Sequence, residues 1–269
     1  MLDIMLEDFP FSSLWNSGIF LFLAFTVIIY LFILPQEKDH PLWKQVVFFL
    51  GLVVVFIGAA SPLNIIGRIQ FSAHIIQVIL LVFIAPPLLI IGMKRRIIDL
   101  ALKVNVLAEL IDFIIKPYCT IGLFFLALYG YHHPPIFDQA RVDLYGNYLY
   151  LFLLFITGIL LWIPIISKKV TLKSTTMYHL ICMALILPLG GILVLSKEIL
   201  YQAYTDLTTF TQALEVCLPA GETLSPELVL LLLPFEPIAE QHIGGIIWII
   251  SGLIILMISL FVKRRMITK

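Results

Sequence analysis

Residues 71–92 read FSAHIIQVILLVFIAPPLLIIG, an apolar run that contains no acidic residue, lysine or arginine. A helix rises 1.5 Å per residue and the hydrocarbon core of a bilayer is about 30 Å thick, so about 20 such residues cross it. The run therefore predicts a membrane-spanning helix that Pro86 and Pro87 bend near its end. His74, near its start, is an ionisable residue in a segment that otherwise suits lipid.

The whole chain shares this apolar character. Of its 269 residues, 61% are hydrophobic and 13% are charged, whereas soluble domains are roughly 45–50% apolar. The mean hydropathy is +1.06. We therefore predict an all-α, polytopic membrane protein that lies in the lipid bilayer as one domain, residues 1–269. Seven transmembrane helices are predicted, at residues 18–34, 43–60, 69–92, 113–131, 147–166, 176–195 and 242–262.

The charges predict the orientation of these spans. All but three of the 17 basic residues fall on one side, the exceptions being Arg68, Arg141 and Lys197, and residues 198–240 on the other side are acidic. Because basic loops stay in the cytoplasm, we predict the N-terminus outside and the C-terminus inside. The first ten residues, MLDIMLEDFP, lack the basic residues of a signal peptide, so we expect the first span to be retained.

Two other apolar segments are not predicted to cross the membrane. Residues 97–116 place their polar side chains along one stripe of a helix, which is typical of a helix lying on the inner surface. Residues 227–237, ELVLLLLPFEP, are too few to span and end at prolines. We expect this second segment to dip into the outer interface as a cap over the helix ends.

Four of the six histidines are predicted to share one layer at the outer side. They are His74, His132, His133 and His242. Imidazole is the commonest metal ligand and suits copper and zinc, so these four are candidate metal ligands. Asp138, Asp143 and Glu240 are candidate acceptors for their ring N–H groups. The alternative is structural: a hydrogen bond to a neighbouring helix for His74, and a headgroup position for His132 and His133.

The chain lacks the residues that several functions of membrane proteins require. A retinal protein needs a lysine in its last span, and residues 242–262 contain none. The middles of the spans carry no charged residue, which disfavours ion or proton transport. Nucleotide-binding loops, catalytic triads and zinc-protease motifs are absent, so we expect neither an enzyme nor a nucleic-acid partner. Haem held by two histidines of the outer layer is an open alternative.

Five stretches, in this order, resemble the CtaG-type family of cytochrome c oxidase assembly factors. They are the run at 71–92, YHHPPIFDQA at 131–140, YLFLLFITGILLWIPI at 150–165, LYQAY at 200–204 and EQHIGGIIWII at 240–250. The resemblance covers roughly residues 60–260. It implies a seven-span bacterial membrane protein that helps to mature the copper-containing oxidase, through copper delivery to a subunit on the outer face.

The chain departs from the family pattern at two positions. The pattern has a second histidine four residues after the first in the third span, where this chain has Val78. It also has a histidine in the fifth span, and residues 147–167 contain none. The ligands that the resemblance carries over are therefore His74, His242 and one of His132 and His133.

The sequence thus predicts a non-enzymatic assembly factor in the bacterial cytoplasmic membrane. It would bind a cytochrome c oxidase subunit and handle copper at a shallow histidine site on the outer side. Two alternatives stay open. One is a metal-free membrane scaffold for an oxidase subunit, and the other is a haem-binding electron carrier.

Overall fold

The computed structural model describes residues 7–34, 40–94, 103, 105–166, 172–233 and 236–267. These residues form helices and the turns that join them. Five of the helices are long and apolar enough to cross a membrane, which agrees with the predicted all-α membrane class. They are α4 (Leu42–Ala60), the continuous rod α6–η2–α7 (Phe71–Ile79, Leu80–Ile84 and Ala85–Gly92), α12 (Leu144–Ile166), α13 (Leu172–Leu195) and α16 (Pro237–Ile267).

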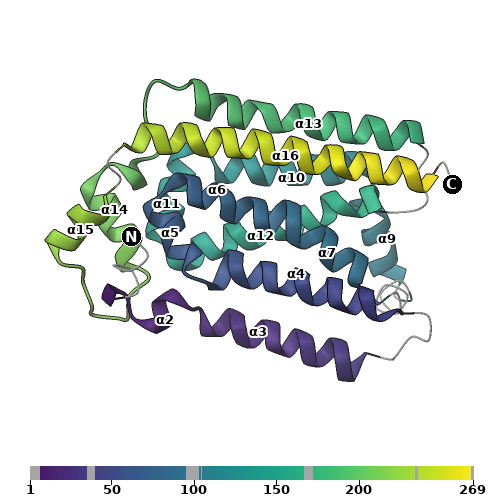
Figure 1. The fold of residues 1–269 in the computed structure, drawn as a ribbon, viewed down its shortest axis with the longest axis horizontal. Helices are drawn as coiled ribbons and strands as arrows, with labels where there is room; N and C mark the ends of the chain where they lie inside the picture. The colour runs from purple at the N-terminus through teal and green to yellow at the C-terminus, as the bar shows by residue number, and fades with distance from the viewer. Residues whose placement is uncertain are drawn as a thin grey trace.

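Two shorter apolar helices run alongside these five in the bundle (Figure 1). They are α3–η1 (Ser17–Ile28 and Ile29–Ile33) and α10 (Pro117–Tyr131). Each coincides with a predicted span, although α10 begins four residues later than residue 113. Lys116 is extended, as a residue before proline prefers, so the preceding helix α9 (Asn105–Ile114) cannot continue into α10. Membrane crossing by all seven segments, and the orientation of the termini, stay predictions.

The rod α6–η2–α7 is the most buried of the five long helices. In its most apolar window 61% of the residues are buried, against 22–39% for the other four. α16 packs against α6, while α4 and α12 pack against α7. His74 therefore lies on a helix that is surrounded mainly by protein rather than lipid.

The rod contains a π-helical turn, η2, directly before the helix α7 that carries Pro86 and Pro87. Pro86 has no N–H, so the carbonyl of Val82, four residues earlier, loses its usual helical partner. The indole Nε1 of Trp162 on α12 donates to that oxygen at 2.9 Å. The indole bond thus satisfies a carbonyl that the proline leaves open, as an apolar environment requires.

Short helices gather at one end of the bundle and form what we call the cap (Figure 1). The cap consists of α5 (Leu63–Ile69), α11 (Pro134–Val142), η3 (Gln202–Tyr204), α14 (Leu207–Glu215) and α15 (Pro226–Leu232). Ile65 and Ile69 pack in one apolar cluster with Phe210, Leu214 and Val229. The segment predicted to cover the helix ends thus lies in the cap, and α9 lies at the opposite end of the bundle.

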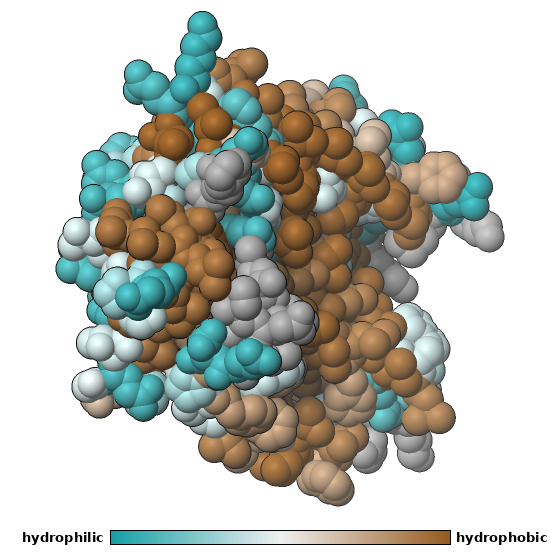
Figure 2. Space-filling view, turned by 60° about the vertical axis from the view of Figure 1, so that its left-hand side comes forward, coloured by the Kyte–Doolittle hydropathy of each residue, from teal (hydrophilic) through white to brown (hydrophobic). Residues whose placement is uncertain are grey.

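The flanks of the bundle expose large apolar side chains. Phe20, Leu21 and Phe22 on α3 are more than half exposed, and so are Leu149 and Phe152 on α12. Figure 2 shows a broad hydrophobic band beside a cap surface in which hydrophilic residues are mixed. Soluble monomers rarely expose apolar surface of this extent, whereas helices that face lipid do.

Candidate functional site

The structure gives the four predicted ligands different surroundings. His74 on α6 and His132, directly after α10, are both buried. His133 is exposed and forms the N-cap of α11. His242 on α16 is partly buried, and its Nε2–H donates to the carbonyl of Ser196 at 3.0 Å. Among the described residues, no three His, Cys, Asp or Glu side chains are grouped so that they could hold a metal ion.

His74 and His132 lie next to each other, and we call them the His pair. Their ring centres are 5.7 Å apart and the rings are inclined by 40°. Phe137 of α11 lies 5.2 Å from the His74 ring and 6.0 Å from the His132 ring, between centres. Gly67 of α5 packs directly on His74, because a Cβ there would be 3.2 Å from the His74 Cα. Residues of α5 and α11 therefore cover the pair, whose own members lie on α6 and at the end of α10.

Gln77 fixes the protonation of the His74 ring. Its side-chain nitrogen donates to the carbonyl of Gly58 at 2.7 Å and to Oδ1 of Asn64 at 3.1 Å. The Gly58 carbonyl can only accept, so Oε1 of Gln77 is the atom that faces Nδ1 of His74, at 3.2 Å. Nδ1 of His74 must then carry the proton, which leaves Nε2 with a free lone pair.

His132 is held in the same tautomer by the backbone. Its Nδ1 donates to the carbonyl of Leu128 at 2.9 Å, one turn earlier on α10. The pKa of the His132 imidazole is lowered to about 4, chiefly by burial and further by the charge of Arg141, against the opposing effect of the Leu128 bond. The ring is therefore neutral at pH 7, and its Nε2 also carries a lone pair.

Both Nε2 atoms are buried without a hydrogen-bond partner among the described residues. A neutral imidazole with one nitrogen bonded and the other bare is the form in which histidine binds metals, and the bond at Nδ1 orients the ring. The pair thus presents two neutral nitrogens of the kind that ligate metal ions. The arrangement offers two ligands, fewer than the three that the sequence suggested.

The three predicted carboxylate partners have other roles. Asp138 accepts hydrogen bonds from the backbone N–H groups of Gln202 and Ala203 at 3.1 and 3.0 Å. Glu240 accepts from the hydroxyl of Ser72 at 2.5 Å, and Asp143 accepts from the Tyr145 N–H at 3.1 Å. The groups that orient the His pair are instead an amide and a backbone carbonyl.

Sequence reasoning missed Gln77 and Phe137. Gln77 had a detectable signal, because a glutamine three residues after His74 in an apolar helix lies near the same face and needs a partner. Phe137 gave no signal, since a phenylalanine in an apolar chain is indistinguishable from ordinary core.

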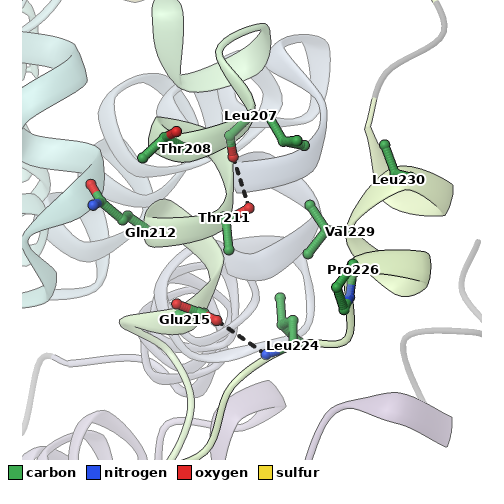
Figure 3. Close-up of a pocket in the computed structure, with 9 residues that line it drawn as sticks. All are labelled: Leu207, Thr208, Thr211, Gln212, Glu215, Leu224, Pro226, Val229 and Leu230. Carbon is green, nitrogen blue, oxygen red and sulfur yellow. Dashed lines mark hydrogen bonds between the residues drawn. The ribbon is translucent and has the colours of Figure 1, made fainter.

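A groove of about 460 Å³ lies between α14 and α15, away from the His pair (Figure 3). Leu207, Val229 and Leu230 line it together with polar residues of α14. Glu215 closes one end, where its Oε1 accepts from the Leu224 N–H at 3.1 Å. None of the four predicted histidine ligands lines this groove.

Comparison with known proteins identifies a family. Residues 19–269 match the family model described as cytochrome c oxidase caa3 assembly factor (Caa3_CtaG). No curated protein and no solved structure matches the chain. The matched segment contains the His pair, the cap and all five long helices. Because it covers nearly the whole sequence, the chain belongs to the Caa3_CtaG family of cytochrome c oxidase caa3 assembly factors.

Proposed function

We propose that this assembly factor handles copper, and that it holds Cu(I) as cargo between Nε2 of His74 and Nε2 of His132. The supporting observation is that two adjacent buried imidazoles each keep a bare Nε2 while Nδ1 is bonded. A buried acceptor without a donor costs about 1–3 kcal/mol. A ligand shared by both nitrogens would remove both penalties.

The number of ligands favours Cu(I) over the other ions that imidazole binds. Structural zinc takes four ligands and catalytic zinc takes three from the protein, whereas the His pair supplies two. Cu(II) prefers a square arrangement of nitrogen and oxygen ligands. Cu(I) has a filled d shell and accepts two ligands in a line. Two neutral imidazoles therefore suit Cu(I) best.

The two bare nitrogens of the pair are closed to solvent. Nε2 of His74 and Nε2 of His132 each expose less than 1 Å² of surface, so water does not reach them. A metal ion bound about 2 Å from nitrogen needs less room than a water molecule. The ion would therefore enter without its hydration shell, as expected of transfer from one set of protein ligands to another.

The same packing argues against haem at this position. Phe137 and Tyr131 contact both rings of the pair, with centres 5.1–6.0 Å apart. A porphyrin inserted between His74 and His132 would have to displace both aromatic side chains. This packing favours copper over haem at the His pair.

The metal-free scaffold is the second candidate. Val78, which stands where the family pattern has a histidine, is fully buried in the apolar core. His242 is bonded to Ser196 instead of joining the pair. A chain that keeps two of the expected ligands could assist the oxidase through its surface alone, by binding a subunit in the bacterial cytoplasmic membrane.

Complementation of a deletion strain separates the two candidates. We expect the wild-type chain and a His133→Ala/His242→Ala double variant to restore both oxidase activity and the copper content of the purified oxidase. The double variant His74→Ala/His132→Ala should restore neither, at equal protein level in the membrane. Full rescue by this second variant would exclude copper handling by the His pair and select the scaffold.

A further inference from the structure

Two arginines are buried in the cap beside the His pair. Arg68 on α5 is 1% exposed and Arg141 on α11 is 0% exposed. We call them the Arg pair. Arginine stays protonated in proteins, so the cap contains two fixed positive charges. Burial of such charges costs several kcal/mol each unless an opposite charge compensates.

The groups that the Arg pair contacts are neutral. Nη1 of Arg68 donates to the carbonyls of Arg141 and Ala213, at 2.6 and 2.8 Å. Nη2 of Arg141 donates to the carbonyl of Gly67 at 2.6 Å and to the hydroxyl of Tyr204. Each side chain thus bonds the backbone at or next to the other arginine, which keeps the two charges together.

The remaining nitrogens have no partner among the described residues. They are Nε and Nη2 of Arg68, and Nε and Nη1 of Arg141. Burial raises the pKa of Tyr204 to about 12, so its hydroxyl stays neutral beside Arg141. The carboxylate of Asp138 is near enough to interact with the charge of Arg141, but its hydrogen bonds go to two backbone N–H groups rather than to the guanidinium. In the part of the chain that the structure describes, the positive charge is therefore not neutralised by an ion pair.

The Arg pair lies close to the proposed copper ligands. Cζ of Arg141 is 4.8 Å from the centre of the Phe137 ring, and this ring is 5.2 Å from the His74 ring. The charge is therefore within about 10 Å of the His74 imidazole, in a dry region where salt screens little. Gly67 gives a second connection, since it accepts from Arg141 and packs on the His74 backbone.

We propose that the Arg pair lowers the affinity of the His pair for a cation, so that the metal is held weakly and released readily. This inference rests on the proposed copper function and concerns the regulation of the same site. The two imidazoles supply neutral donors, and the nearby positive charges oppose any cation that binds them. A unit charge about 10 Å away, at an effective dielectric constant of about 20, weakens cation binding on the order of tenfold.

The test measures the affinity of the detergent-purified protein for Cu(I) by competition with a chromophoric Cu(I) chelator. Arg141→Gln should bind Cu(I) about tenfold more tightly than the wild type, and Arg68→Gln should shift the affinity in the same direction. Arg141→Lys keeps the charge and should stay near the wild-type value. Lys94→Gln is the matched control, because Lys94 is also buried but bonds the carbonyl of Tyr30, away from the cap.

The direction of the change in Cu(I) affinity distinguishes an electrostatic role of the Arg pair from a structural one. Loss of a purely structural residue loosens the site and weakens binding, whereas loss of a repelling charge strengthens it. Unchanged or weaker binding by both glutamine variants would overturn the inference, while loss of binding in His74→Ala would still support the copper function. If neither the wild type nor any variant binds Cu(I), the proposed function and this inference both fail. Copper binding by a glutamine variant alone would support the inference.

Discussion

Gln77 of α6 joins three buried polar groups. It bonds Nδ1 of His74, the carbonyl of Gly58 and Oδ1 of Asn64, all in a buried region. Replacement by methionine keeps the volume but leaves three polar groups without a partner. We expect Gln77→Met to lower the free energy of unfolding by about 2–4 kcal/mol, which thermal unfolding in detergent would show as a lower Tm.

The control for this variant is Gln139→Met. Gln139 is an exposed glutamine of α11, and its replacement should leave Tm unchanged. Equal Tm values for Gln77→Met and Gln139→Met would show that the Gln77 network does not stabilise the fold.

At the level of single residues, the sequence predicted part of the site. Depth along the spans placed His74 and His132 in one layer, and the structure brings them together. It also placed His133 and His242 there, but depth does not say which way a side chain points. His133 is exposed at the start of α11, and His242 turns to Ser196. Such choices depend on rotamers and on neighbouring helices, neither of which a single sequence records.

At the level of elements, the contact between α13 and α16 depends on glycine. A Cβ at Gly190 would overlap Cγ1 of Ile249 and lie 3.2 Å from the carbonyl oxygen of Gly245. The neighbouring Gly191 has nothing within 4 Å of its Cβ position. We expect Gly190→Ala to destabilise the protein by about 1–3 kcal/mol, because it forces the two helices apart. Gly191→Ala should have no such effect.

The two alanine variants differ in position by one residue, so they share expression and detergent effects. The difference between their Tm values therefore measures how much stability depends on the close approach of α13 and α16. If Gly191→Ala is as destabilised as Gly190→Ala, the packing described for α13 and α16 is wrong.

The sequence predicted the cores of the long helices better than their ends. The apolar pattern predicted the cores of the long helices, but it started the last one at residue 242, whereas α16 begins at Pro237. Gln241 is polar, so the pattern excluded it, yet its Oε1 accepts from the Leu200 N–H at 2.8 Å. A partner from a distant part of the chain stabilises a polar residue inside a helix, and hydropathy alone does not detect such partners.

At the level of the whole molecule, reporter fusions test the predicted orientation of the helices in the membrane. The cap and the end of α16 lie at opposite ends of the bundle (Figure 1). With the basic loops inside, we expect a green fluorescent protein fused after Lys269 to fluoresce and alkaline phosphatase fused there to be inactive. Alkaline phosphatase fused after Gly221, between α14 and α15 of the cap, should be active. The reverse pattern would contradict the predicted orientation.

The central claim is that the His pair binds one Cu(I) ion through two nitrogens, and X-ray absorption at the copper edge tests it most directly. We expect one copper per chain in the Cu(I)-loaded, purified protein, with two nitrogen ligands at about 2 Å and no sulfur ligand. The same sample with His74→Ala/His132→Ala should contain no bound copper. Copper with three or more protein ligands, copper that persists in the double variant, or no copper in the wild type would contradict the claim.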